Sequence, residues 1–336
     1  MKSPITGKEM ILQKEKRVIV FRKEEFTVIH HNFKCVDSNE QFTTTELDEV
    51  NMLQVYNKYR ERHKLPYPEQ IKELRVRYNV PAIKMSEILG FGANMYRNYE
   101  NGEVPNESNS RLIQLAQDPE KFKHLITLSG VYSGDEEKNI LRHIDELIEK
   151  EKQSIWSFNI EDYLLGFDSS IGIHTGYTLP NLEKLREMII YFTATIRPWK
   201  TKMNKLLFYA DFVNFRKTCF SISGTQYRAI DMGPVPNNFN SIFEFAADHE
   251  DINIQQKSFP SGALGEQFLP NPERKFNAEL FNEDELASLK EVEAKFKNTS
   301  VSNIIETSHR EKAWYENYQE GKKLISYEYG FELETI

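Results

Sequence analysis

The first 66 residues alternate between apolar and polar positions in the manner of β-strands. Two segments, 17–22 (RVIVFR) and 25–35 (EFTVIHHNFKC), are rich in Val, Ile, Phe and Thr, and the polar stretch KEE at 23–25 suits a turn. A helix is predicted over 45–63, because Thr45 can cap it and acidic residues occupy its first turn. Its apolar positions form one stripe: Leu47, Val50, Leu53, Tyr56 and Tyr59.

The remaining pattern is mostly helical. Residues 68–119 are typical of four or five short helices, and an acidic helix near 135–152 leads into an aromatic, glycine-punctuated stretch. Beyond residue 177 we predict helices near 180–196, 200–217, 282–297 and 301–318, a strand near 224–231, a stiff turn at 233–236 and an irregular stretch at 253–275. The predicted fold class is therefore α+β and multidomain, with parts at 1–66, 67–119, 120–176 (a connecting region) and 177–336.

Composition fits a folded chain that works in a reducing compartment. Of 336 residues, 39% are hydrophobic and 28% are charged, which is typical of a folded, soluble protein. No apolar stretch approaches the roughly 18 residues of a membrane-spanning helix, and the first ten residues lack the apolar core of a signal peptide. Two cysteines do not make a disulfide framework. We therefore expect a cytoplasmic protein without membrane contact.

Positive charge is concentrated in one segment of an acidic chain. The net charge is −8, yet residues 56–100 carry nine Lys and Arg against five Asp and Glu, whereas residues 120–176 carry six against eleven. A basic segment on an otherwise acidic chain indicates a surface for nucleic acid.

The basic segment contains the sharpest motif, LRVRYNVPAIKMSEILGFGANMYRNYENGEVP at 74–105. It predicts two short helices, about 82–89 and 93–100, joined by GFG. Gly90 stands where the first helix must end in a left-handed turn, which glycine adopts most readily. The residues expected to face a shared core are Met85, Ile88, Leu89, Tyr96 and Tyr99.

One face of the second helix carries side chains suited to reading bases. Arg can bond guanine bidentately and Asn can bond adenine in the same way, and small residues at the start of the helix allow a close approach to the groove. The predicted base-facing residues are Gly92, Ala93, Asn94, Arg97 and Asn98, and the predicted phosphate contacts are Lys84, Arg75 and Arg77.

This stretch resembles the phage-repressor-like helix-turn-helix family. The family pattern is matched without a gap over 74–100 and continues to 105, at Leu74, Arg75, Leu89, Gly90, Tyr99, Glu100, Gly102 and Pro105. Two positions depart from it: Ala82 replaces a glutamine that contacts DNA, and Gly92 replaces a serine. The resemblance implies binding to operator double-stranded DNA as a homodimer, because such folds read paired half-sites. The alternative interpretation is a helical bundle used for protein contact.

Two turns in the β-rich part have the spacing of a zinc knuckle. SPITG begins at Ser3, CVDS begins at Cys35, and cysteine at three of their positions would complete a four-thiolate site. A ribbon before such a helix-turn-helix resembles the MqsA-like antitoxin family, whose metal-ligand positions correspond to Ser3, Thr6, Cys35 and Ser38. Hydroxyls are poor zinc ligands, and neighbouring histidines at 30 and 31 point to opposite faces of a strand. We predict a ribbon that holds no metal.

The C-terminal part carries several separated motifs in a fixed order. They are KLLFYADFVNF at 205–215, SISGTQY at 221–227, GPVP at 233–236 and SHREKAW at 308–314. Together they resemble the Panacea domain, also called the SocA-like antitoxin domain, over about 177–330. That family supplies antitoxins that bind and neutralise unrelated toxins encoded beside them, so the resemblance implies a cognate protein toxin as partner. Aromatic and arginine anchors dominate interfaces, which makes the candidate contacts Trp199, Tyr209, Tyr227, Arg228 and Trp314.

An enzymatic interpretation finds no motif to support it. Asp211, His309 and Glu311 with Lys202 and Lys205 are the conceivable acid–base groups, but no phosphate loop, zinc-protease motif or nucleophile elbow is present. We predict that Asp211 is a buried structural carboxylate, that His309 bonds to backbone, and that there is neither catalysis nor a cofactor.

The sequence therefore predicts an antitoxin that also represses its own operon. Two other functions stay open: a transcription regulator whose C-terminal domain senses a ligand or a phage protein, and a nucleic-acid-processing enzyme.

Overall fold

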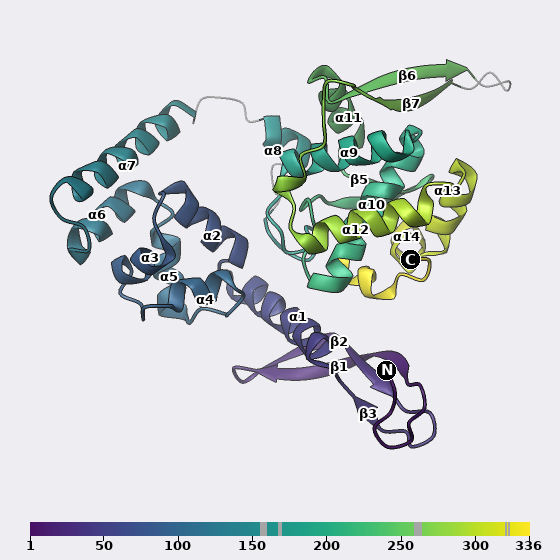
Figure 1. Ribbon diagram of the computed structural model, residues 1–336, viewed down its shortest axis with the longest axis horizontal. Coiled ribbons are helices and arrows are strands. Elements are labelled where there is room, and N and C mark those ends of the chain that lie inside the picture. The colour runs from purple at the N-terminus through teal and green to yellow at the C-terminus, as the bar shows by residue number, and fades with distance from the viewer. Residues whose placement is uncertain (155–159, 167–169, 259–263, 320, 322) are drawn as a thin grey trace. The chain divides into compact units, whose positions relative to one another are not determined.

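The chain folds into two compact units, Met1–Asn159 and Ile160–Ile336. The computed structural model describes residues 1–154, 160–166, 170–258, 264–319, 321 and 323–336 (Figure 1). These ranges contain helices and three small antiparallel sheets. The division between the units falls inside the predicted connecting region. Within the described ranges, no helix has the length and apolar character that crossing a membrane requires.

The first unit begins with a three-stranded antiparallel sheet in the order β1-β2-β3. Its strands are β1 (Ile11–Phe21), β2 (Glu24–Lys34) and β3 (Gln41–Phe42). The register pairs Phe21 with Glu24, so the connecting turn is Arg22-Lys23 and not the predicted KEE. Both turn residues have positive φ, +49° and +69°, which suits the twist of a two-residue hairpin.

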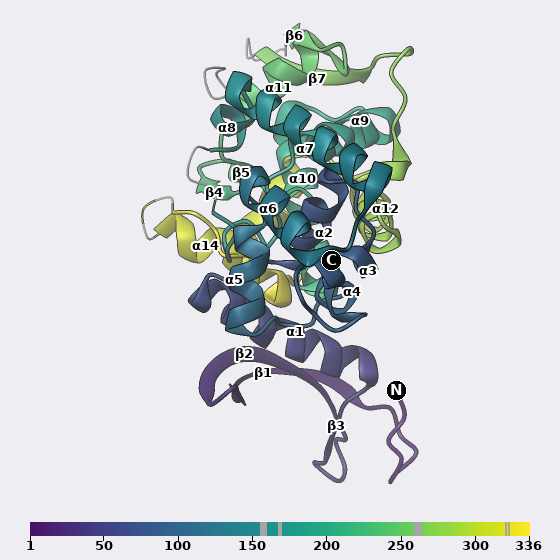
Figure 2. The same ribbon diagram turned by 90° about the vertical axis from the view of Figure 1, so that its left-hand side faces the viewer.

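Helix α1 (Thr45–His63) lies along the edge of β2 that β1 does not occupy (Figure 2). It is capped by Thr44, whose side chain accepts from the Leu47 N–H at 3.3 Å, and not by Thr45. The predicted apolar stripe is also wrong in part. Of its five members only Tyr59 is buried, whereas Asn51 and Gln54 are 3% exposed.

The buried polar side chains of α1 bond to the backbone of β2. Gln54 accepts from the Ile29 N–H and donates to its C=O, both at 2.9 Å. Asn51 does the same for His31, at 2.8 and 3.0 Å, and the Lys58 ammonium donates to the Thr27 C=O at 2.8 Å. The helix thereby satisfies the strand edge as a neighbouring strand would.

Six helices complete the first unit. They are α2 (Pro68–Arg77), α3 (Ala82–Ile88), α4 (Met95–Glu100), α5 (Glu107–Leu115), α6 (Pro119–Ser129) and α7 (Gly134–Ser154). One apolar cluster joins residues from α2 to α7, and Ile144 of the acidic helix α7 is fully buried in it. The apolar side of α7 thus belongs to the same core as the short helices.

Two arginines fasten the β-rich part to the segment that follows α4. The Arg22 guanidinium donates to the C=O groups of Val104 and Pro105, at 2.7 and 2.9 Å. Arg60 is fully buried and donates to the Gly102 C=O at 2.7 Å. Burial lowers the pKa of Arg60 to about 10. These bonds satisfy backbone carbonyls that packing would otherwise leave without partners.

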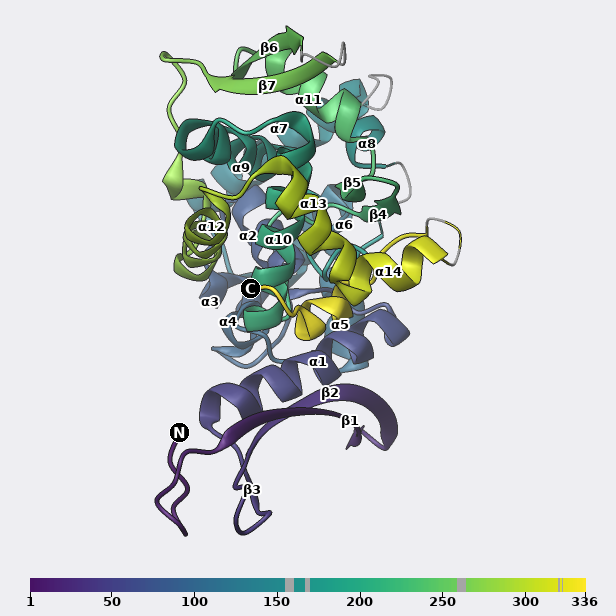
Figure 3. The ribbon, with the colours of Figure 1, turned by 90° about the vertical axis from the view of Figure 1, so that its right-hand side faces the viewer.

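The second unit is built around a buried helix, α10 (Lys200–Thr218), which contacts α9, α12, α13 and β5 (Figure 3). Every residue from 202 to 215 is buried. The other elements of this unit are α8 (Ile160–Leu165), α9 (Leu182–Ile196), β4 (Tyr227–Ile230), β5 (Gly233–Pro236), α11 (Phe239–Asp248), β6 (Ile252–Ser258), β7 (Leu264–Pro270), α12 (Glu283–Phe296), α13 (Val301–Arg310), α14 (Lys312–Gln319) and two 3₁₀ helices, η1 (Ala278–Leu280) and η2 (Tyr327–Glu332).

Three sequence predictions for this unit are wrong. GPVP is not a turn but strand β5, paired with β4, so that the turn lies at 231–232; prolines fit there because an edge strand needs no donor on its outer side. The stretch 253–275 is not irregular throughout, since β6 and β7 pair antiparallel; residues 259–263 of it lie outside the described ranges. The helix predicted at 301–318 breaks at Glu311, whose buried carboxylate accepts from the N–H groups of Glu334 and Thr335.

Candidate functional site

The two knuckle-like turns have the same backbone hydrogen bonds. In the first, the Ser3 N–H donates to the Lys8 C=O at 2.8 Å and the Ser3 C=O accepts from Gly7 at 2.9 Å. In the second, the Cys35 N–H donates to Glu40 and its C=O accepts from Asn39, both at 2.9 Å. The fourth residue after each start, Gly7 or Asn39, has positive φ. The chain therefore forms two equivalent knuckles.

The side chains of Ser3, Thr6 and Ser38 meet around the thiol of Cys35. The Thr6 hydroxyl lies 3.4 Å from the sulfur, and Ser3 and Ser38 also hydrogen-bond to it. Cys35 is 2% exposed and Ser3 is 3% exposed. Ser3, Ser38 and Thr6, in that order, lower the pKa of the Cys35 thiol to about 6.

This donor set does not fit the zinc ion that the ribbon resemblance implies. A structural zinc site needs four good ligands, usually thiolate or imidazole, and one thiol among three hydroxyls does not supply them. Across the described part of the chain, no group of three or more His, Cys, Asp or Glu side chains is placed to hold a metal. The hydroxyls instead bond to the thiol and hold the knuckles together.

The Cys35 thiol is expected to ionise with a pKa of about 6, below its ordinary value. Because its pKa is lowered in the folded chain, the folded state holds the thiolate between about pH 6 and 9 while the unfolded state holds the thiol. Stability from this group is therefore full above pH 9 and lost as the pH falls through 6. Thiolate absorbance near 240 nm should titrate near pH 6. The second thiol is the internal control, because burial raises the pKa of Cys219 far above that range; a single transition above pH 8 would contradict the prediction.

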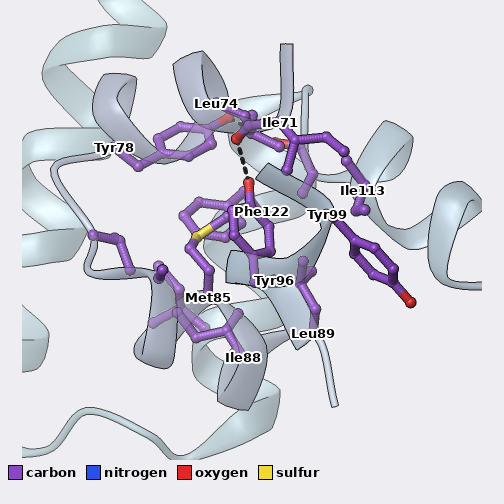
Figure 4. Packing of buried hydrophobic residues seen from close by; sticks show 14 of the residues in the cluster. Ile71, Leu74, Tyr78, Met85, Ile88, Leu89, Tyr96, Tyr99, Ile113 and Phe122 are labelled. Atoms are coloured by element: carbon purple, nitrogen blue, oxygen red, sulfur yellow. Dashed lines mark hydrogen bonds between the residues drawn. The ribbon is translucent and has the colours of Figure 1, made fainter. Parts of the chain in front are cut away.

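The helices α3 and α4 pack on the core that the sequence predicted. Met85, Ile88, Leu89, Tyr96 and Tyr99 are each 5% exposed or less (Figure 4). The Tyr96 hydroxyl donates to the Ile71 C=O of α2 at 2.7 Å, and the Tyr96 N–H donates to the Ser86 hydroxyl at 3.0 Å. Gly90 has φ +69°, as predicted for the end of the first helix.

The predicted base-facing residues are exposed, but only two of them lie in a helix. Because α4 begins at Met95 with Asn94 as its N-cap, Gly92 and Ala93 belong to the preceding turn. Asn94 makes no side-chain cap bond, and its amide thus remains available to a ligand. Arg97 and Asn98 project from α4 itself, next to buried Tyr96 and Tyr99.

The predicted phosphate contacts are engaged within the chain. Arg75 pairs with Glu100 at 2.6 Å, which ties α2 to α4. Lys84 pairs with Glu87 at 3.0 Å, and Arg77 donates to the Gln117 C=O at 3.0 Å. Arg97 is therefore the most direct candidate for a contact with an anion on this surface.

The C-terminal motifs converge inside the second unit. The buried Lys205 ammonium donates to the Pro234 C=O at 3.1 Å, and burial lowers its pKa to about 7. Gly233 has φ +100°, and a Cβ there would lie 2.6 Å from both the Lys205 Cε and the Ser308 hydroxyl. Residues from three motifs thus fix one another in the core.

Asp211 is a structural carboxylate, as predicted. It is fully buried and accepts four hydrogen bonds: from the N–H groups of Ile222 and Ser223, at 2.8 and 2.9 Å, and from the hydroxyls of Ser223 and Tyr227, at 2.6 and 2.7 Å. Burial raises the pKa of Asp211, and the four donors act against that rise. The predicted backbone bond of His309 is also present, to Asp231.

Two of the predicted partner contacts cannot reach a partner in this fold. Tyr209 and Tyr227 are 0% exposed. The Tyr209 hydroxyl donates to the Glu311 carboxylate at 3.3 Å, and the Tyr227 hydroxyl donates to the Asp211 carboxylate. Tyr209 lies in α10, which is buried throughout 202–215, and the Tyr227 ring packs on Phe208 and Phe212 of the same helix.

The other three predicted contacts have accessible surface. Trp314 is half-buried in a ladder of rings: His309 stacks on it at 3.8 Å between centroids and Tyr318 at 4.6 Å. Its indole N–H donates to the Ile230 C=O at 2.7 Å. Arg228 is exposed, and its Nε donates to the Asn237 amide oxygen at 2.7 Å.

Trp199 lines a cleft of about 530 Å³ beside the β6–β7 hairpin. Leu264 on the hairpin is 70% exposed there, and Lys200 pairs with Glu266 across the cleft at 2.6 Å. The sequence predicts Trp199 at this surface but not the strands beside it. Only Ile252 and Ile254 alternate with polar residues, and 255–258 (QQKS) are all polar, so the local pattern gives only a short signal for β6.

The C-terminal motifs lie within a region that matches a known domain family. Residues 203–315 match the family model described as antitoxin SocA-like, Panacea domain. Residues 203–315 form a Panacea domain. The resemblance inferred over 177–330 is thus confirmed for this stretch, which contains Lys205, Asp211, Gly233 and Trp314. No curated protein shows significant similarity to the chain.

Proposed function

We propose that the chain is an antitoxin that neutralises a co-encoded protein toxin through its Panacea domain and represses its own operon through its helix-turn-helix. The match over residues 203–315 carries the first half of this proposal. The exposed polar surface around α4 carries the second.

The Panacea domain has the features of a binding domain. Polar motif residues such as Asp211 and Lys205 form hydrogen bonds inside the domain. Accessible aromatic surface is found at Trp199 and Trp314. Half-buried aromatic side chains with polar neighbours are the kind that dominate protein interfaces. We infer that these two tryptophans, with Arg228, contact the toxin.

Co-expression tests the toxin-binding role. The tagged full-length chain, expressed with its neighbouring genes, should copurify with a small protein that is toxic alone and silent in its presence. Trp199→Ala and Trp314→Ala should weaken that rescue, whereas Leu128→Ala, at a 69%-exposed position of the first unit, should not. Recovery of DNA with no protein partner would overturn the antitoxin proposal and favour the regulator.

The second test concerns operator DNA. Replacing Arg97 by Ala should weaken binding about 10- to 100-fold, because a bidentate base contact contributes roughly 1–3 kcal/mol; Asn94→Ala should have a similar effect. The measurement is fluorescence anisotropy with the upstream region of the gene at fixed salt, since ionic contacts make affinity salt-dependent. Arg111→Ala is the matched control, because this arginine is also exposed but lies on α5. Equal loss in all three variants would contradict a base-reading role for α4.

The cleft at Trp199 supports the alternative function, a transcription regulator that senses a ligand. Its volume of about 530 Å³ lies within the range of small-molecule sites. A small molecule that changes DNA affinity in the absence of any toxin would favour this alternative.

A further inference from the structure

The outward sides of the two long strands, β1 and β2, differ in how their backbone groups are bonded. The edge of β2 is satisfied almost residue by residue: Lys58 bonds Thr27, Gln54 bonds Ile29, Asn51 bonds His31, and β3 pairs with Phe33. The edge of β1 has no pairing strand within the described residues, over the 11 residues from Ile11 to Phe21.

The register shows which backbone groups face that open edge. Because odd-numbered residues of β2 bond to α1, its even-numbered residues bond to β1, and their partners there are odd-numbered: Val28 with Arg17, for example, and His30 with Glu15. The even-numbered residues of β1, from Leu12 to Val20, therefore direct their N–H and C=O groups outward. An open edge of this length, without proline, is a template for another strand.

We propose that β1 pairs with β1 of a second copy of this chain, antiparallel and about a twofold axis at Lys16. Pairing over the whole strand places that axis at the middle residue of Ile11–Phe21. In this register Glu15 lies opposite Arg17 of the second copy, and the pair occurs twice. The register that uses the entire edge is thus also one in which opposite charges meet.

Side-chain exposure agrees with this register. Leu12, 45% exposed, lies opposite Val20 of the second copy, 66% exposed, so apolar surface is covered on both sides of the axis. Glu15 and Arg17 pair with each other at 2.5 Å within one chain, and their side chains are 32% and 40% exposed, which leaves them accessible to a second copy. Moving the axis by one residue to 15 or 17 would place Glu15 opposite Glu15 or Arg17 opposite Arg17. The like-charge pair at Lys16 involves two long side chains that can diverge into solvent.

Charge reversal and proline substitution test the pairing in the full chain, without DNA or toxin. Analytical ultracentrifugation should find the natural chain dimeric at micromolar concentration. Arg17→Glu should weaken the dimer at least tenfold, and Glu15→Arg with Arg17→Glu in one chain should restore it. Lys16→Pro should give a monomer, because it removes an outward N–H and no β1–β2 bond; unchanged circular dichroism and thermal unfolding would show that it still folds.

Two outcomes would overturn the proposal. The first is a natural chain that is monomeric at about 100 μM. The second is a dimer that survives Lys16→Pro. Because the experiment uses neither DNA nor toxin, its failure leaves the antitoxin proposal standing.

Discussion

A chain carrying Ser3→Cys, Thr6→Cys and Ser38→Cys together is expected to bind one zinc ion tightly, whereas the natural chain should bind none in stoichiometric amount. The knuckles already have matching backbone bonds, and the Thr6 hydroxyl lies 3.4 Å from the Cys35 sulfur. Zn–S bonds of about 2.3 Å in a tetrahedron put ligand sulfurs roughly 3.8 Å apart, so thiolates at these positions need only small adjustments.

The expected free energy of zinc binding is large. Structural zinc in small domains contributes about 10–16 kcal/mol at pH 7, and here the fold is present before the metal arrives. We expect a dissociation constant in the nanomolar range or below, read as one zinc per chain by mass spectrometry of the native protein and as the spectrum of tetrahedral, thiolate-bound Co²⁺.

A matched variant separates geometry from chemistry. The matched variant carries Ser3→Ala, Thr6→Val and Ser38→Ala together. It changes the same positions but leaves Cys35 as the one thiol there, so it should bind no zinc and should lose the hydrogen bonds to Cys35. Less than about 0.1 zinc per chain in the three-cysteine variant would show that the knuckles are not in ligand geometry. Stoichiometric zinc in the natural chain would show that the metal-free interpretation is wrong.

Replacing Asp211 by Ala is expected to destabilise the second unit by about 3–5 kcal/mol. The substitution leaves four buried donors without an acceptor, and each unsatisfied donor costs roughly 1–3 kcal/mol before relaxation or entry of water. Because the donors come from 222–227 and Asp211 lies in the central helix, the change detaches the segment entering β4 from α10. Urea unfolding, followed by far-ultraviolet circular dichroism, measures the loss.

Tyr227→Phe provides the control for that experiment. It removes one of the four donors and keeps the ring, so a loss of about 1 kcal/mol is expected. A loss below 1 kcal/mol for Asp211→Ala would mean that the carboxylate is not the structural centre of this network. Toxin binding measured at a temperature where both variants remain folded would then show whether Asp211 has a role at the interface.

Local pattern was sufficient where the burial of an element follows its own periodicity. The helix at 82–88, the positive φ of Gly90 and the inward positions of Met85 and Tyr96 all follow from residue spacing and the properties of glycine, whereas the second helix begins at 95 and not at the predicted 93. The Panacea match likewise spans the short motifs that the sequence carries in order between 205 and 314. For these parts the sequence by itself determined the local structure, because each residue's preference agrees with its tertiary environment.

Only the tertiary structure decided which face of α1 is buried. Its apolar stripe predicted one face, yet Asn51 and Gln54 turn inward because the edge of β2 needs donors and acceptors, and apolar side chains cannot supply them. The same holds for Tyr209 and Tyr227, which have the chemistry of interface anchors. Tyr209 is buried because it lies in the enclosed helix α10, and Tyr227 of β4 is buried because its ring packs on Phe208 and Phe212 of that helix. The meeting of Ser3, Thr6, Cys35 and Ser38 was foreseeable from spacing, but the bonds that replace the metal depend on side-chain positions that two distant turns fix together. Residues far apart in sequence satisfy one another's backbone and polar groups, and no local pattern records that requirement.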